Sequence, residues 1–386
     1  MPQRSLTPTY AGGQAALATT AVAGTSERDV ALPYRPETEP LSDDALRVTI
    51  LGSGSPWLTK AQAGGSLLVE VGNDARDLFL FDLGSGALAN FSGLRLPMTS
   101  LKKLFLSHLH VDHVGDVLSF IGGYGRIGRL DPVEIWGGGA EDPALGVDAF
   151  VEHTEKALAW NLASVAGIAP TSGAHATAHA IPVHRPATVY ESDGVTVQSF
   201  PVIHGLAGAV GYRLDFAGRS VVFSGDTSPS WTVVEAARDC DLLIHDAALP
   251  AAVFAEYMQM PLDQAERVVR QGHTTTPAVG MVLAETEPRM AALWHCQVIE
   301  GQIEPVFEAV AERWQGPTVL CQDLTVFDVD AAGVTARQAL VDPMARKVIG
   351  SSRTDRHIDV RPEPPAWWSE IAMDWEARLE RTEDER

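Results

Sequence analysis

The segment FLSHLHVDHVGD, residues 105–116, constrains the fold and chemistry of this chain more than any other. It places four candidate metal ligands within six positions: His108, His110, Asp112 and His113. In an extended segment, the spacing H-x-H lets two side chains point the same way, and the following Asp-His pair points elsewhere. Because one ion cannot comfortably take all four from so short a segment, the spacing predicts two metal ions side by side.

The flanks of this segment indicate a built site. The run KKLFLS before it is apolar and strand-like, and VGDVLSFIGGY after it is typical of the start of an apolar helix. A ligand loop between a strand and a helix holds its side chains rigidly. Imidazole nitrogen and carboxylate oxygen without thiolate suit zinc, and also iron or manganese. A histidine-rich surface loop is the alternative, and the apolar flanks argue against it.

Three more candidate ligands lie downstream, each at the end of an apolar, strand-like run. His204 ends VTVQSFPVIH, Asp226 follows VVFSG, and His295 ends RMAALWH. A random distribution of histidines would rarely give this pattern, so we expect these three residues to complete the ligand set.

In this order, the motifs resemble those of the metallo-β-lactamase superfamily. H-x-H-x-D-H is followed by an isolated histidine, by Gly-Asp-Thr and by a last histidine. The segments RVTILGSGSP and LFLFDLGSG resemble the first strands of that superfamily. GHTTTPAVGMVLAE and PVIHGLAGAVGYRL are similar to its ribonuclease Z branch, and the whole chain resembles ribonuclease Z-like metallo-β-lactamases of environmental origin. The resemblance covers residues 47–342.

The resemblance implies a dinuclear zinc site with a hydroxide between the ions as the nucleophile. A metal-bound water has a pKa of about 7, which makes hydroxide available at neutral pH. The implied ligands are His108, His110 and His204 for one ion, Asp112, His113 and His295 for the other, and Asp226 as the bridge.

Two residues are candidates for catalytic roles beside the metals. Asp112 is close enough to the implied water to steer it or accept its proton. His273, in GHTTT, is expected to donate to the oxyanion or the leaving group without binding metal. A helix-capping or purely supporting role for His273 is the alternative.

Four other residues are expected to support the site or line it. Asp82, in FDLGSG, is expected to orient a ligand histidine through a hydrogen bond. His245 and Asp246 end the apolar run DLLIHD and are expected to lie next to the site. Cys296 directly follows His295 and is expected to line the pocket wall without binding metal.

Strand and helix patterns predict an α/β fold. Two similar halves suggest two mixed sheets packed face to face with helices outside, the four-layer αβ/βα sandwich of the resembled superfamily. We divide the chain into an arm at 1–45, a hydrolase domain at 46–345 and a tail at 346–386, with a lid or interface insertion at 137–190. Expected strands lie near 47–52, 66–71, 78–82, 103–107, 133–136, 195–203, 209–216, 219–224, 241–245, 289–294, 318–321 and 324–328. Expected helices lie near 142–166, 230–238, 249–259, 276–286 and 303–314, and 169–186 is expected to be a loop.

Charge guides the choice of substrate. The chain has 50 acidic and 29 basic residues, a net charge of −21, and the insertion holds one lysine, Lys156. Phosphate backbones are bound mainly by lysine and arginine, so a small cyclic amide or ester such as a β-lactam or lactone is favoured. A phosphodiesterase or ribonuclease Z-like endonuclease acting on RNA stays open. A mononuclear iron oxidoreductase on the same fold, which belongs to another class of enzyme, also stays open. The intact ligand set argues against a binding protein with a vestigial site.

The remaining expectations concern location and assembly. No apolar run reaches the ~18 to 20 residues that span a membrane, and GGQAALATTAVAGTS is a poor export signal, so we expect a cytoplasmic protein, with weak export as the alternative. The tail after Lys347 contains Trp367, Trp368 and Trp375. Such aromatic residues dock on the body or on another copy, and we expect a homo-oligomer, a dimer or tetramer.

Overall fold

The computed structural model describes residues 22–23, 32–57, 59–126, 129–168, 170–299, 301–345, 348 and 363–373. Most of the expected N-terminal arm, and Trp375 in the tail, lie outside the described residues.

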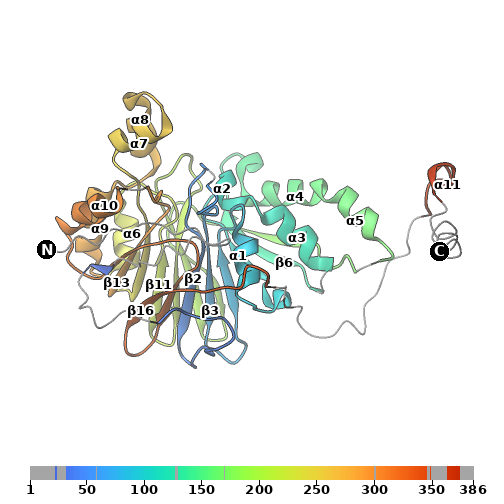
Figure 1. Ribbon diagram of the computed structural model, residues 1–386, viewed down its shortest axis with the longest axis horizontal. Coiled ribbons are helices and arrows are strands. Elements are labelled where there is room, and N and C mark those ends of the chain that lie inside the picture. Colours follow the sequence, from blue (N-terminus) through green and yellow to red (C-terminus); the bar gives the residue numbers. More distant parts are fainter. Residues whose placement is uncertain are drawn as a thin grey trace, which may run out of the picture.

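Two eight-stranded sheets form the centre of the described fold (Figure 1). Their strands follow the period-two pattern of half-buried strands. In β2, for example, Leu46, Val48 and Ile50 face the other sheet, whereas Leu51 faces the helices. The first sheet has the order β16 (Val334–Gln338), β15 (Thr325–Val329), β2 (Leu46–Gly52), β3 (Ser66–Val71), β4 (Leu78–Phe81), β5 (Lys103–Phe105), β6 (Val133–Gly138), β7 (Ala176–Ile181). The second has the order β1 (Val22–Ala23), β14 (Thr318–Leu320), β13 (Met290–Trp294), β12 (Leu242–Asp246), β11 (Arg219–Phe223), β10 (Val210–Phe216), β9 (Val195–Pro201), β8 (Ala187–Ser192).

Helices cover the outer face of each sheet, which gives the predicted four-layer αβ/βα sandwich (Figure 1). One apolar cluster fills the space between the sheets, and a further cluster lies between each sheet and its helices. The first sheet is covered by α1 (Ala87–Gly93), α3 (Val117–Arg126), α4 (Val147–Ala157) and α5 (Ala159–Val165), with short 3-10 turns at Met98–Ser100 and Pro143–Leu145. The second is covered by α6 (Trp231–Ala237), α9 (Thr276–Thr286) and α10 (Ile303–Ala311).

Three helices stand at one edge of the sandwich. Figure 1 shows α2 (Val111–Val114) at the top of the sheets, with α7 (Ala251–Met258) and α8 (Leu262–Gly272) projecting above them. A small apolar cluster of their own holds α7 and α8 together, and the ring of Trp57 packs edge-on against Phe254 in it. The remaining helix, α11 (Trp368–Ile371), lies away from the sandwich in the tail.

The sheet topology brings many strand ends to this same edge. Strands β4, β5 and β6 run parallel to one another, as do β11, β12 and β13. Strand β9 has the direction of β11, because β10 is antiparallel to both. The carboxyl ends of parallel strands meet at one edge, where binding sites of α/β folds form. Residues that follow these strands therefore converge.

Several elements differ from the sequence prediction. The stretch 169–186 was expected to be a loop but contains β7, an edge strand paired with β6. The pattern also failed to indicate β8, β16 and helices α1 and α8. The expected helix at 142–166 is divided into a 3-10 turn, α4 and α5.

Buried Arg129 joins the segment 137–190 to the first sheet's helical layer. Its guanidinium donates hydrogen bonds to the carbonyl oxygens of Phe120 and Ile121 in α3 and of Gly173. A side chain at Gly173 would collide with the Arg129 backbone, so the two segments touch directly. Among the residues that the structure describes, no helix is both long and apolar enough to cross a membrane.

Candidate metal centre

The segment with the four clustered ligands turns from a strand into a helix, as its flanks predict. His108 and His110 follow β5, and Asp112 and His113 lie in the single turn of α2. Gly64 and Gly84 leave room for this turn, because an added Cβ at either would lie 2.6 Å or less from the carbonyl oxygen of Asp112.

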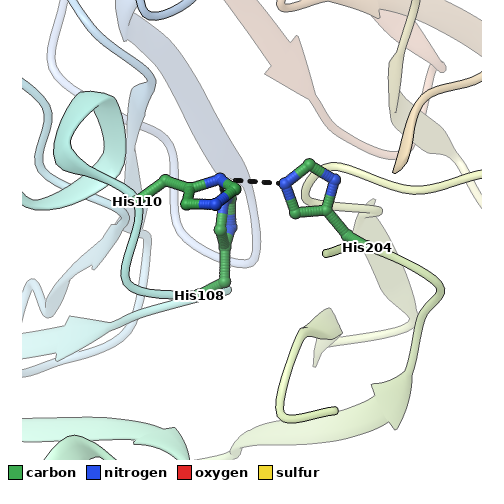
Figure 2. A group of neighbouring side chains, drawn as sticks. All are labelled: His108, His110 and His204. Carbon is green, nitrogen blue, oxygen red and sulfur yellow. Dashed lines mark hydrogen bonds between the residues drawn. The ribbon is translucent and has the colours of Figure 1, made fainter. Parts of the chain in front are cut away.

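His108, His110 and His204 form a first ligand group (Figure 2). His204 follows β9 and faces the other two side chains across the edge of the sandwich. His110 Nδ1 lies 3.0 Å from His108 Nε2 and 3.0 Å from His204 Nε2. Nitrogens around a tetrahedral zinc with bonds of about 2.0–2.1 Å lie about 3.3 Å apart. His110 Nδ1 is near this separation from both other nitrogens, and all three lie within 4.8 Å of one another.

Asp112, His113 and His295 form a second ligand group, of which all three side chains are buried. His295 directly follows β13, and its Nε2 lies 3.1 Å from Asp112 Oδ2. His113 Nε2 lies 3.4 Å from the same oxygen. The two groups coincide with those that the family resemblance implies for the two ions.

Asp226 stands between the two groups. Its Oδ2 lies 3.9 and 3.8 Å from the Nε2 atoms of His108 and His204 in the first group. The same oxygen lies 3.3 and 3.5 Å from the Nε2 atoms of His113 and His295 in the second. One carboxylate oxygen that faces both groups is suited to bridge two cations.

Several buried polar atoms here have no hydrogen-bond partner among the described residues. Among them are Oδ1 of Asp246 and, in or between the two groups, Oδ1 of Asp112, Oδ1 of Asp226 and Nε2 of His113. A buried polar atom without a partner costs about 1–3 kcal/mol, and the last three atoms lie in the second group or on Asp226 between the groups. Cations between the groups would satisfy them, so the residues present fit divalent metal ions.

Hydrogen bonds on the far side of the rings fix which nitrogen faces the centre. Asp82 accepts a hydrogen bond from His113 Nδ1 at 2.8 Å, and Asp82 is itself held by the backbone N–H and hydroxyl of Ser107. The carbonyl oxygen of Gly272 accepts from His204 Nδ1 at 2.7 Å. Such outer contacts set the tautomer and orientation of ligand histidines.

Two of these residues have left-handed backbone conformations. Asp82 has φ 56° and His295 has φ 60°, and each directly follows a strand. This region is uncommon for residues other than glycine and costs of order 1–3 kcal/mol. It turns the chain sharply at the strand end, so that both side chains lie at the site.

The imidazoles of the first group are held neutral. Burial and neighbouring histidines hold the pKa of His108 well below its ordinary value. Burial likewise lowers the pKa of His110 and of His204. Neutral imidazole is the form that binds metal.

The second group carries the opposite electrostatics. Burial opposes a charge on His113, but Asp226 and Asp82 outweigh it and raise the pKa of His113 well above its ordinary value. Burial alone would raise the pKa of Asp226, but His295 and His113 hold it well below its ordinary value. The site therefore collects negative charge that protons balance, and metal ions would replace those protons.

His273 lies next to both groups. Its Nδ1 is 3.0 Å from Asp246 Oδ2 and 4.0 Å from Asp226 Oδ2, and its side chain is 16% exposed. Burial lowers its pKa, but the charge and hydrogen bond of Asp246 outweigh burial and raise the pKa of His273 to about 9. Asp226, Asp246, His273 and His295 also lie close enough to hold a cation together. Because Asp246 engages Nδ1 of His273, the geometry favours a proton donor.

A cavity of about 580 Å³ opens beside the first group. His108, His110 and His204 form part of its wall, and α4 forms another part. Segment 137–190 therefore borders the candidate site.

The structure places the other expected residues as follows. Asp246 lies at the site through its bond to His273. His245 is buried and belongs to no group of potential ligands among the described residues. Its Nδ1 donates a hydrogen bond to the carbonyl oxygen of Asp246. The expectation for Cys296 is wrong, because its side chain is buried in the apolar cluster between the second sheet and its helices. Ser107 and Gly272 lie within the quoted motifs, directly before His108 and His273, but their supporting contacts were not expected from the sequence.

Comparisons with known proteins agree with this geometry. Residues 79–296 match the family described as Beta-lactamase superfamily domain. The chain is 30% identical over 298 residues to a ribonuclease Z of Mycobacterium avium, covering 74% of this chain and 99% of that protein. It is 27% identical over 334 residues to a ribonuclease Z of Methanosarcina acetivorans, covering 74% and 98% of the two chains.

Solved structures share the fold. A metallo-β-lactamase fold protein from Bacillus subtilis superposes with a TM-score of 0.56 at 19% identity, over 74% of this chain and 100% of the other. The short form of human tRNase Z superposes with a TM-score of 0.53 at 18% identity, over 72% and 98% of the two chains.

Proposed function

This chain belongs to the metallo-β-lactamase superfamily, in its ribonuclease Z-like branch, and is a metal-dependent hydrolase. From this premise, we propose that it cleaves phosphodiester bonds and that its substrate is RNA. One observation carries the proposal: the ribonucleases Z of Mycobacterium avium and Methanosarcina acetivorans are matched over almost their whole length. A site with two adjacent ligand groups suits the chemistry, because paired cations stabilise the attacking and leaving oxygens of a phosphodiester.

Two zinc ions per chain are the proposed cofactors. The first group offers three imidazoles, the second offers two imidazoles and a carboxylate, and Asp226 faces both. Nitrogen and oxygen donors without thiolate suit zinc, and also iron or manganese. A mononuclear iron oxidoreductase that used only the first group would leave Oδ1 of Asp112 and Nε2 of His113 without partners among the described residues.

Two residues of the chain would carry the proton transfers, Asp112 at the attacking water and His273 at the departing oxygen. When bound, the metal ions supply an activated water and Lewis-acid polarisation of the phosphoryl oxygens. Asp112, whose Oδ1 has no hydrogen-bond partner among the described residues, would steer the attacking water or accept its proton. His273 would protonate the departing oxygen through Nε2, because Asp246 holds its Nδ1 and keeps the ring charged at neutral pH.

The proposed substrate, RNA, differs from the small cyclic amide or ester that the net charge favours. Net charge describes long-range attraction, whereas the reaction depends on the ligands and the proton donor. An RNA substrate also fits the cytoplasmic location expected from the sequence. A lactone or β-lactam is the second candidate, because the cavity beside the first group is lined by leucines such as Leu118, Leu145 and Leu206.

A substrate panel tests the proposal. Zinc-loaded protein would be assayed with precursor tRNA, bis(p-nitrophenyl) phosphate, a chromogenic β-lactam and a lactone. We expect cleavage of the two phosphodiesters. Hydrolysis of the β-lactam or the lactone alone would overturn the phosphodiesterase proposal in favour of the second candidate.

A further inference from the structure

The cavity beside the first ligand group has an unusual lining for a site that handles phosphate esters. Among the described residues that line it, the ionisable side chains are the three histidines of that group and His153, and none is Lys, Arg, Asp or Glu. At about 580 Å³, it has the size of a small-molecule site, about 300–1,000 Å³.

Three leucines from separate elements reach the cavity and remain exposed. Leu118 in α3 is 45% exposed, Leu145 in a 3-10 turn is 56% exposed, and Leu206 after β9 is 74% exposed. Phe150 of α4 adds an aromatic ring to the same wall. A gathering of exposed apolar side chains at a concave site marks a binding surface for an apolar group.

Close backbone contacts fix the shape of this cavity. A Cβ added at Gly138, at the end of β6, would lie 2.0 Å from the carbonyl oxygen of Gly208. A Cβ added at Gly122 in α3 would lie 2.4 Å from the side chain of Leu158, which follows α4. The loop after His204 and helix α4 are thus held directly against the first sheet and α3, so the lining is preformed.

A phosphate of a neighbouring nucleotide would be poorly placed in this cavity. A charge removed from water without a partner costs far more than a buried methylene gains. Of the four histidines in the lining, three belong to the first ligand group, so only His153 is free of that group and could pair with such a charge.

We propose that this cavity binds an uncharged alkyl or aryl group carried by the substrate next to its reacting phosphoester. The inference rests on the proposed phosphodiesterase function and narrows its substrate class. The reacting phosphorus would lie at the two ligand groups, and the apolar substituent would extend past His110 towards Leu118 and Leu145.

Binding of a homologous series tests the inference without requiring turnover. Methyl-, butyl- and hexylphosphonate would be titrated calorimetrically into the zinc-loaded protein. Because a fully buried methylene contributes about 0.8 kcal/mol, Kd should fall by up to about fourfold per added methylene. In the double variant Leu118→Ser/Leu145→Ser this dependence on chain length should be lost.

Leu130→Ser is the matched control. Leu130 is 46% exposed, precedes β6 at the end opposite Gly138 and does not line the cavity, so this variant should keep the full dependence. Equal affinities along the series, absence of binding, or a dependence that survives the double variant would each overturn the inference. Failure of the same preparation to cleave bis(p-nitrophenyl) phosphate, with the dependence intact, would refute only the phosphodiesterase proposal.

Discussion

His273 is the residue on which the proposed acid catalysis depends. His273→Ala should lower kcat by about 10²–10⁴-fold, the range for loss of a general acid or base, with the metal content retained. The loss should be larger for RNA than for bis(p-nitrophenyl) phosphate. The leaving group in RNA is a ribose alkoxide, which needs a proton, whereas p-nitrophenolate needs little protonation. Steady-state kinetics with elemental analysis of the same samples would measure both effects.

The control for this variant is His179→Ala. His179 lies in the edge strand β7, next to Glu134, and belongs to neither ligand group. Its replacement should leave both rates unchanged. Equal losses on the two substrates in His273→Ala would show that His273 only supports the site.

Glu70 gives a pH-dependent prediction far from the metal centre. Burial raises the pKa of Glu70 to about 7, although its cross-strand neighbour Arg47 lowers it. A carboxyl with a raised folded-state pKa stabilises the fold below its unfolded pKa of 4.5, and this stability is lost as pH rises through 7. Glu70→Gln should therefore match the parent at pH 4 to 5 and exceed it by up to about 3 kcal/mol at pH 8.

Urea unfolding at several pH values would measure this difference. Glu191→Gln is the control, because Glu191 is exposed on β8, and its effect should be small at every pH. If the free energy of unfolding of Glu70→Gln varied with pH as the parent's does, the pH-dependent loss of stability would come from another group.

At the residue scale, the sequence predicted ligands better than it predicted their supports. Candidate ligands could be recognised because spacing, as in His108 and His110, and strand ends, as at His295, are visible along the chain. Their division between two ions came from the resemblance to the superfamily and stays a prediction. The roles of Ser107 and of the Gly272 carbonyl could not be predicted. These partners act through hydroxyl and backbone atoms that only the folded geometry brings to His108 and His204.

At the scale of elements, Arg129 provides a test of how the segment 137–190 is held. Arg129→Ala removes buried hydrogen bonds to three carbonyl oxygens, including that of Gly173. Charge-assisted hydrogen bonds and the cavity left behind together predict a loss of about 2–4 kcal/mol in the free energy of unfolding. Urea denaturation would measure it, with exposed Arg185→Ala as a control expected to change stability by less than about 0.5 kcal/mol. An Arg129→Ala variant as stable as the parent would contradict this anchoring role.

Elements were predictable where burial is complete and missed where it is partial. Strand β13 is buried along its length and was found, whereas β7, β8 and β16 are largely half-buried or exposed and lack a clear apolar alternation. Helix α8 was also missed, although Ala265 and Val269 form a helical stripe between Pro261 and His273. Its core is a small cluster with α7, apart from the main sandwich.

At the scale of the whole molecule, metal content separates the dinuclear hydrolase from the mononuclear oxidoreductase. Elemental analysis should give two zinc-class ions per chain, falling to one in His113→Ala, which impairs only the second group. Chelation should lower Tm, since a ligand at 100 times its Kd stabilises the folded state by about 2.7 kcal/mol. One ion in the parent, with no contribution from Asp112 or His113, would favour the oxidoreductase.

The tail carries exposed apolar side chains that bear on the assembly of the protein. Four apolar side chains are exposed along the tail, Trp367, Trp368, Ile371 and Met373, and α11 lies away from the sandwich (Figure 1). Exposed aromatic clusters of this kind mark interfaces, and symmetric dimers are the commonest assemblies. We therefore propose that the tail docks on a second copy of the chain.

Truncation of the tail decides between this contact and internal packing. Val348 should be kept, because its carbonyl accepts a hydrogen bond from the Met98 backbone at 3.1 Å. Deletion of residues 349–386 should convert a dimer to a monomer in light scattering and leave Tm of the monomer unchanged. Trp367→Ser/Trp368→Ser should weaken the dimer, whereas Trp231→Ser, an exposed tryptophan on α6, should not. A parent that stays monomeric at all concentrations would refute the assembly. A truncated monomer with a lowered Tm would show instead that the tail folds back on its own chain.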